Sequence, residues 1–301
     1  MGGNQFSIIY GNICAAIGDL SQARLAEVKA VLNMVYLGEI LNADPDRPMF
    51  FLRRFDDSIK TKSSDTIVSI TKASPAVMTT ANDTYQTGDI ISPFDVVGMT
   101  DIEHRMFKLT RTGAKTYNLY TIDGTIINSS SYAAAATGGT IYHRGSLLSA
   151  AVKSILSVNW HGYSRPLDPI SSAELEDNVS LYEDNTSRPL KFHHYKTFTS
   201  TGAEIDIILW FSIPDTNYQM RLWYEFSPAA MSNDTDYPVL PPQFHPAIEA
   251  GAITRLGENK TQVEAGVIWP QLYAKHLDAL KDYNRNLWKN YEQKRSGLYL
   301  I

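Results

Sequence analysis

The chain has seven histidines and one cysteine, the side chains that most readily bind metals or act as bases and nucleophiles near neutral pH. His193 and His194 are adjacent in a segment that predicts a β-strand, so their imidazoles point to opposite faces and cannot chelate one metal ion. His245 and His276 lie in helical patterns with no second histidine three or four residues away. We interpret all four as core, interface or surface residues.

Two further motifs could bind phosphate or attack a substrate. Gly138-Gly139-Thr140 lacks the lysine and the earlier glycine of a phosphate-binding loop, and a tight β-turn requires the same glycines. Cys14 has no neighbouring histidine or basic cluster to activate it, so we expect a buried, inert thiol.

Paired acids could serve as general acid and base. The pairs Glu174/Glu176 and Glu204/Asp206 have the alternating pattern of solvated faces, and no other pair stands out. We therefore predict no catalytic residue, no cofactor-binding residue and no metal site, and expect that the chain is not an enzyme.

Composition narrows the class of protein. Of the 301 residues, 44% are hydrophobic and 20% charged, which is ordinary for a folded chain. A formal charge of −5 argues against binding to nucleic-acid phosphates, which normally requires a basic excess. The single cysteine excludes an intrachain disulfide and suits synthesis in a reducing cytoplasm. No stretch approaches the roughly 20 apolar residues of a membrane span, so no membrane partner is predicted.

The amino-terminal part predicts a helix preceded by an arm. Asp19 is the expected N-cap, with Gln22 completing a capping box, and Asn42 and Pro45 end the pattern. Met1 to Tyr10 lacks the basic start and long apolar run of a signal peptide, and we interpret it as a polar arm that orders only on a partner. The apolar stripe of the helix comprises Leu25, Val28, Leu32, Val35 and Tyr36.

From Pro48 to about Pro241 the pattern changes to short β-branched runs separated by Gly, Pro, Asn and Asp. Short runs separated by these turn-forming residues are typical of antiparallel β structure and not of βαβ units. Residues 146–158 fit both helical and strand spacing. The predicted strands are 49–55, 66–71, 107–109, 116–122, 205–211 and 218–226.

Helical spacing returns near the end of the sequence. Residues 242–256 predict a helix with Gly257 as its C-cap, and Thr261 with Glu264 forms a second capping box. A long amphipathic helix should follow, with Pro270 in its first turn or at a kink. Its apolar and aromatic stripe comprises Trp269, Leu272, Tyr273, His276, Leu277, Leu280, Leu287 and Tyr291.

A lone amphipathic helix cannot bury its stripe, so the helices of the two ends are expected to pack together. The predicted fold class is α+β. Residues 1–45 and 241–301 form a helical bundle, and residues 46–240 form a large antiparallel β insertion, either barrel or sandwich.

Within the insertion, residues 66–144 contain a Thr87-Gly88-Asp89 turn, a run at 96–102, Tyr117-Asn118-Leu119-Tyr120 and a run at 132–141. This region resembles the small β module of phage tail and neck proteins that is compared with the FCCH domain of ubiquitin-activating enzymes. The likeness concerns shape and carries over no catalysis. Residues expected to fill its small barrel or sandwich are Val96, Met99, Phe107, Tyr117 and Leu119.

A second series of motifs runs from Ser157 to Glu258. It comprises Arg165-Pro166-Leu167-Asp168-Pro169-Ile170, then 210–215, 218–224 and 240–245. This order is similar to that of head-to-tail adaptor proteins of tailed bacteriophages, including the tail tubular protein A type, and the opening helix fits the same family.

The resemblance implies a virion protein of the neck or tail, made in the host cytoplasm. Its copies would form a ring, a dodecamer of twelve subunits, between the portal protein and the downstream tail or nozzle proteins. DNA would pass through an acidic channel without specific binding. The candidate portal-docking peptide is Ser296, Gly297, Leu298, Tyr299, Leu300 and Ile301; the alternative is that this peptide folds back on its own subunit.

Two other readings remain open. The chain could be a different interaction protein of the virion, such as a tail fibre or baseplate component, which trimeric and elongated particles would favour. An enzyme, such as a cell-wall hydrolase carried by the tail, would require a paired-acid or Cys/His site.

Overall fold

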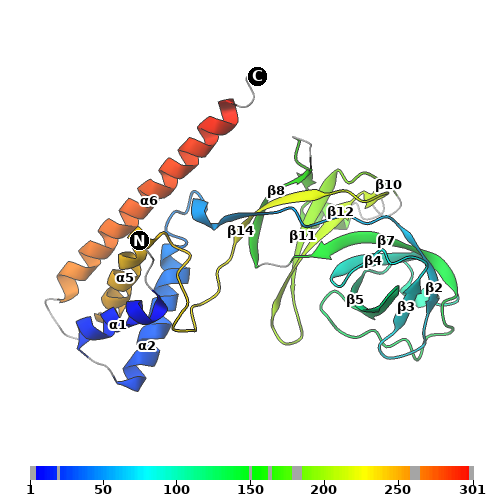
Figure 1. Ribbon diagram of the computed structural model, residues 1–301, viewed down its shortest axis with the longest axis horizontal. Helices are drawn as coiled ribbons and strands as arrows, with labels where there is room; N and C mark the ends of the chain where they lie inside the picture. Colours follow the sequence, from blue (N-terminus) through cyan, green and yellow to red (C-terminus); the bar gives the residue numbers. More distant parts are fainter. Residues whose placement is uncertain are drawn as a thin grey trace. The chain divides into compact units, whose positions relative to one another are not determined.

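The computed structural model describes residues 5–18, 21–148, 151–161, 165–177, 185–257 and 265–297, with the side chains of 176–177, 265–267 and 293–297 left aside. The chain divides into two units (Figure 1). Met1–Arg53 and Ser227–Ile301 form a helical unit, and Arg54–Phe226 form a β unit. The chain therefore combines helices with a large multi-sheet β region, which is compatible with the predicted α+β class. The sequence analysis predicted the boundaries between these two units at 45/46 and 240/241, whereas the structure has them at 53/54 and 226/227.

The helical unit takes its helices from both ends of the chain. The first part contributes α1 (Phe6–Ile17), α2 (Gln22–Asn33), the π-helix η1 (Met34–Ile40) and the 3₁₀ turn η2 (Phe50–Leu52). The second part contributes η4 (Pro242–Phe244), α5 (His245–Gly257) and α6 (Ala265–Gly297). All of them share one apolar core, whose members include Ile9, Leu32, Ile40, Ile248, Leu256 and Leu280.

Helix α1 shows that the predicted polar arm at 1–10 is wrong for residues 6–10. Phe6, Ile9 and Ile13 lie on one face at a spacing of three and four residues, and all three are fully buried. The first backbone amides of the helix, which have no partner within it, donate to the carbonyls of Asp236 and Asp234 at 2.8 and 3.1 Å. The chain itself therefore supplies the partner that orders this segment.

Helix α2 begins later than predicted. Its N-cap is Ser21, whose Oγ accepts a hydrogen bond from the Arg24 amide at 3.3 Å, as N-cap side chains do. The predicted cap, Asp19, lies outside the described residues, and Gln22 is the first helical residue. The predicted stripe is confirmed: Val28, Leu32, Val35 and Tyr36 are buried, and Leu25 packs against the same core.

The two carboxy-terminal helices match their predicted apolar patterns. In η4 and α5, Phe244, Ile248, Ile253 and Leu256 are buried. Pro270 lies inside α6, which already begins at Ala265, so the proline is not in the first turn. The predicted capping box of Thr261 and Glu264 lies outside the described residues.

Six strands of the β unit close into a barrel. They pair antiparallel in the order β2 (Asp65–Ile70), β3 (Val77–Thr80), β6 (Thr116–Tyr120), β5 (Phe107–Gly113), β4 (Asp89–Val97) and β7 (Gly138–Leu147), and β7 pairs again with β2. The short turn η3 (Thr100–Ile102) follows β4. The barrel core contains Val96, Met99, Phe107, Tyr117 and Leu119, as the sequence predicted.

The tight turn expected at Gly138-Gly139 is not observed. These two residues are the first residues of strand β7. Opposite it, the register of β4 shifts between Phe94 and Val97, and Asp95 has a φ of 52°. A Cβ atom on Gly139 would stand 3.0 Å from the Phe94 carbonyl oxygen. The glycine is therefore required by a β-bulge, where two backbones approach closely.

The remaining strands form a sandwich with the far end of β7. That end pairs with β12 (Glu204–Phe211), which pairs with β11 (Lys191–Phe198) and then β9 (Asp168–Pro169). A second sheet contains β1 (Arg53–Asp56), β14 (Met220–Phe226) and β8 (Val152–Trp160). The two sheets share one core, with Trp210 and Phe192 from the first and Val158 and Leu222 from the second.

Smaller elements complete this unit: α3 (Ser172–Asp177) and the parallel pair β10 (Thr186–Ser187) and β13 (Ile213–Pro214). Within the ambiguous stretch 146–158, residues 146–147 end β7 and residues 152–158 belong to β8. The strand predicted at 49–55 is instead η2 followed by β1.

Candidate functional site

His193 and His194 lie on β11 with different partners, and each is satisfied within the protein. His193 is buried, and its Nδ1 lies 2.8 Å from the Ile170 carbonyl oxygen. His194 Nε2 lies 2.9 Å from Asp206 Oδ1. Burial lowers the pKa of His194, and the hydrogen bond to Asp206 partly offsets that effect. Among the described residues, no group of three or more His, Cys, Asp or Glu side chains could hold a metal ion.

Asp206 does not belong to a solvated face, contrary to the prediction. Only 6% of its surface is exposed, and its carboxylate also accepts from Lys196 Nζ at 3.1 Å and from the Val152 amide at 3.3 Å. Glu204 is exposed and pairs with Lys196. Both acids lie on the same face of β12, but Glu204 stands at the exposed start of the strand, whereas Asp206 is buried and links β11 to the start of β8. The side chain of Glu176 lies outside the described residues.

A serine, a histidine and an aspartate meet where β4 and β7 pair, which the sequence analysis missed. His143 Nε2 lies 3.4 Å from both Asp89 Oδ1 and Ser146 Oγ. A catalytic relay uses one ring nitrogen for the nucleophile and the other for the acid, whereas here a single nitrogen faces both groups. His143 is also completely buried, so no substrate can reach its ring. We interpret the trio as a structural link between strands.

The other candidate residues lie mainly in the helical unit. His245 is 2% exposed, and its Nε2 lies 2.9 Å from the Leu240 carbonyl oxygen. Burial lowers the pKa of His245, and the hydrogen bond to Leu240 partly offsets that effect. Cys14 is buried in the helical core, as predicted. His276 is half-buried on α6.

Helix α6 is only partly covered by the rest of its unit. Between residues 268 and 292, where side chains are described, only Tyr273, Leu280 and Asn284 are buried, and Ile268 is 64% exposed. Along the apolar stripe of α6, Trp269, Leu272, Leu277 and Tyr283 pack against the helical core and keep part of their apolar surface exposed. The half-buried members of this stripe are Trp269, Leu272, Leu277, Tyr283, Leu287, Trp288 and Tyr291.

The second half of α6 also binds the segment that leads towards the β unit. Asn284 Oδ1 accepts from the Phe50 amide at 2.7 Å, and Trp288 Nε1 donates to the Pro48 carbonyl oxygen at 2.8 Å. These bonds anchor the backbone of 48–50 along the helix.

Arg53, the last residue of this part of the helical unit, is held by aromatic rings. Its guanidinium carbon lies 5.2 Å from the ring centre of Phe50, 4.9 Å from that of Trp288 and 4.2 Å from that of Tyr291. Cation–π contacts of this kind stabilise a charged side chain against apolar surface. The chain therefore leaves the helical unit from a fixed position on α6.

The predicted docking peptide follows directly after this region. Ser296 and Gly297 are the last residues of α6, and the side chain of Ser296 is outside the described set. Leu298, Tyr299, Leu300 and Ile301 lie outside the described residues. The peptide's role stays a prediction.

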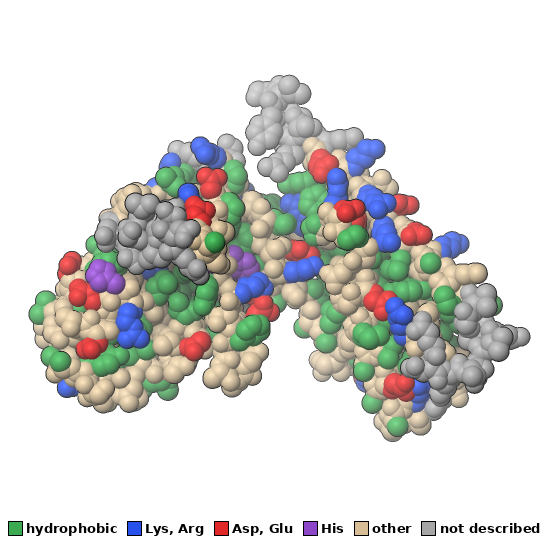
Figure 2. Space-filling view, turned by 180° about the vertical axis from the view of Figure 1, so that it is seen from behind, with side chains coloured by type: hydrophobic (Ala, Val, Ile, Leu, Met, Phe, Trp, Pro, Cys, Tyr) green, Lys and Arg blue, Asp and Glu red, His purple; other side chains and the backbone are tan. Residues whose placement is uncertain are grey.

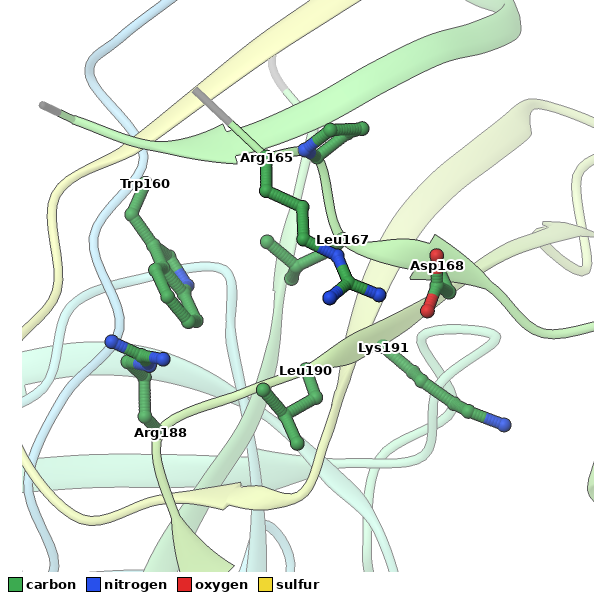
Figure 3. Close-up of a pocket in the computed structure, with 8 residues that line it drawn as sticks. Trp160, Arg165, Leu167, Asp168, Arg188, Leu190 and Lys191 are labelled. Carbon is green, nitrogen blue, oxygen red and sulfur yellow. The ribbon is translucent and has the colours of Figure 1, made fainter. Parts of the chain in front are cut away.

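The β unit contains a cavity of about 310 Å³ beside the motif 165–170 (Figure 3). Trp160, at the end of β8, forms one wall, and the segments 165–168 and 188–191 form the others. These segments are joined by backbone hydrogen bonds, from the Leu167 amide to the Val158 carbonyl at 2.7 Å and from the Asp168 amide to the Leu190 carbonyl at 3.1 Å.

Cations dominate the polar lining of this cavity. The Arg188 guanidinium carbon stands 3.6 Å from the ring centre of Trp160. Figure 3 shows the Arg165 side chain directed into the space between Trp160 and Asp168, while Lys191 extends away from Trp160. Lys191 Nζ lies 2.8 Å from Glu174 Oε1.

The outer surface mixes charges of both signs. Figure 2 shows acidic and basic side chains interspersed over the face that it presents, without a broad basic stripe among the residues described there. No helix in the described part of the chain is both long enough and apolar enough to cross a membrane.

No protein-family model matches the chain, and no curated protein sequence matches it.

Proposed function

We propose that the chain is a structural virion protein of a tailed bacteriophage, an adaptor that joins the portal to the tail. Its copies form a ring of twelve that lines the channel through which DNA leaves the capsid. One observation carries the proposal. Helices from both chain ends share a single core and present α6, whose apolar stripe is only half-buried within the chain.

The half-buried stripe supports assembly of copies side by side. Each exposed apolar group left in water costs about 25 cal/mol per Å² of surface, so contact with a neighbour is favourable. In this proposal the helical unit is the bundle that forms the body of the ring. A closed ring needs two different side faces on each subunit, and α6 supplies one of them.

The charge supports passage of DNA without binding. The chain has a formal charge of −5, and a lumen lined by such subunits repels the duplex and lets it slide. The peptide 296–301 docks on the portal, and the β unit contacts the downstream tail or nozzle proteins. The chain acts through complementary surfaces and not as an enzyme.

The test is the mass and shape of the purified protein, alone and with portal protein added, measured by light scattering and negative-stain microscopy. A ring under either condition supports the proposal. Elongated trimers would instead identify a tail-fibre or baseplate component, and a protein that stays monomeric under both conditions would contradict it.

A matched pair of variants tests the role of α6. Ile268→Glu puts a charge on a side chain that is 64% exposed, so folding is unaffected while the interface is disrupted. Ala274→Glu adds the same charge at an exposed position of the helix, about 120° around the helix axis from Ile268. We expect that only the first variant impairs assembly. Equal assembly of both would place the interface elsewhere.

A further inference from the structure

We infer that the cavity beside Trp160 is a binding site for a small organic anion, a carboxylate or phosphate monoester joined to an apolar body. The adaptor proposal does not use this cavity, and the inference is independent of it. The motif Arg165-Pro166-Leu167-Asp168-Pro169-Ile170 builds one wall. Four properties of the lining support the inference: size, rigidity, charge and apolar surface.

The size of the cavity suits one small ligand. Pockets for small molecules measure roughly 300–1,000 Å³, and this cavity, at about 310 Å³, is at the lower end. A single aromatic or aliphatic group with one charged substituent fits such a space.

The walls of the cavity are held in place before any ligand binds. Asn159 and Pro166 form an antiparallel bridge, so the motif returns alongside β8. On the other side, Asp168 pairs with Lys191 in the register of β9 and β11. Because the three wall segments are tied by backbone bonds, little conformational entropy is lost on binding.

The charges around the cavity favour an anion. Three cations and one carboxylate line it, although the chain as a whole is negative. Lys191 is engaged by Glu174, so recognition falls mainly on Arg165. Arg165 is exposed, and its side chain is directed into the cavity (Figure 3).

The stacking of Arg188 on Trp160 orients its guanidinium. A guanidinium that lies on an aromatic face keeps its N–H groups in the plane, where they can bind a carboxylate or phosphate through two hydrogen bonds. The contact at 3.6 Å therefore fixes the orientation of this positive charge at the cavity wall, where a metal cation would be repelled.

The apolar part of the lining defines the rest of the ligand. Leu190 is 57% exposed, and Leu167 and Trp160 contribute apolar surface beside it. Asp168 stands on the far rim (Figure 3), where it would repel a second negative group. The ligand therefore has its charge at one end and an uncharged, apolar body at the other.

The test is isothermal titration calorimetry of the full chain at low salt with three probes: phenylacetate, phenyl phosphate and the neutral phenylacetamide. We expect at least one charged probe to bind in the millimolar range or tighter, and the amide to bind at least about tenfold more weakly, since a charge-assisted hydrogen-bonded pair accounts for that ratio. The absence of binding by both charged probes, or equal binding of the amide, would overturn the inference.

Variants locate the site. Arg165→Gln should weaken binding of the charged probe at least about tenfold, whereas Lys72→Gln, which removes a cation of the barrel away from the cavity lining, should leave it unchanged. Circular dichroism checks that both variants are folded. If Arg165→Gln binds as the parent does, the inference is wrong.

A fourth probe distinguishes two kinds of ligand that carry the same carboxylate group, a protein segment and a small molecule. The blocked dipeptide acetyl-Phe-Glu-amide carries its carboxylate on a peptide, whereas phenylacetate is a free acid. Tighter binding of the dipeptide would assign the site to an acidic segment of a protein, and tighter binding of the free acid or phosphate would assign it to a small metabolite. Either result must depend on Arg165, or the inference fails.

Discussion

Arg255 donates two hydrogen bonds to Glu39, from Nε to Oε1 at 2.9 Å and from Nη2 to Oε2 at 3.1 Å. The Tyr273 hydroxyl donates to the same Oε2 at 2.9 Å. Glu39 lies in η1, Arg255 in α5 and Tyr273 in α6, so one carboxylate links helices from the two ends of the chain. Substitution of Glu39 therefore tests how much this link contributes to the stability of the helical unit.

Removing the charge of Glu39 should weaken the helical unit. We expect Glu39→Gln to lower the free energy of unfolding by about 1–2 kcal/mol, because charge-assisted hydrogen bonds are lost while partial exposure screens them. The side chains of Glu39 and Arg255 are 26% and 40% exposed. Urea unfolding measures the change. As a control, Asp278→Asn removes an exposed pair with Lys281 and should cost less than about 0.5 kcal/mol; equal effects of the two variants would contradict this prediction.

The same link predicts a dependence on pH. Partial burial alone would raise the pKa of Glu39, but the hydrogen bonds from Arg255 and Tyr273 outweigh it and lower the pKa below its ordinary value of 4.5. A carboxyl group with a lowered pKa adds stability above its unfolded pKa, and that stability is lost as the pH falls through the folded pKa. The difference between the parent and Glu39→Gln should therefore be full at neutral pH and shrink below 4.5. A constant difference down to the acid transition would refute it.

The packing of α6 gives a third prediction. Leu280 is completely buried, so Leu280→Ala should cost about 2–5 kcal/mol, the usual range for emptying a core leucine site. Ile268→Ala on the same helix, where the side chain is 64% exposed, should change stability by less than about 0.5 kcal/mol. Similar losses in chemical denaturation would mean that α6 does not pack through Leu280.

Two glycines should respond to alanine in opposite directions. A Cβ atom on Gly145 would stand 2.2 Å from the Ile208 carbonyl oxygen, where β7 and β12 pair, so Gly145→Ala should destabilise the β unit by more than about 2 kcal/mol. Gly11 lies inside α1 with no atom within 4 Å of such a Cβ. Gly11→Ala should therefore stabilise the chain by about 0.5–1 kcal/mol. Thermal unfolding measures both, and a destabilised Gly11→Ala would show that α1 packs more closely than described.

Local patterns in the sequence were sufficient for much of the fold. The stripe of α2 and the barrel residues Val96, Phe107 and Leu119 were predicted because periodicity reports directly which face is buried. Helix α1 was missed although Phe6, Ile9 and Ile13 recur at helical spacing, because the segment was treated as a polar end. The choice of Ser21 over Asp19 as cap lies within the usual uncertainty of helix boundaries.

The arrangement of strands and the cavity could not be predicted in the same way. Asp89 and His143 meet only because β4 pairs with β7 across the barrel, and local periodicity does not record which strands pair. Similarly, Arg188 stacks on Trp160 from the segment between β10 and β11, far from Trp160 in the sequence. The motif containing Arg165 was recognised as a pattern, but its place in a cavity depends on these long-range pairings.

Strand β7 serves two structures at once: residues 140–141 pair with β2 of the barrel, whereas residues 145–147 pair with β12 of the sandwich. A deletion of the barrel strands, β7 included, would also remove the strand that pairs with β12. The unpaired backbone N–H and C=O groups of β12 would then form an exposed edge that promotes aggregation. Because one strand completes both structures, the sandwich depends on β7 of the barrel for the pairing of β12.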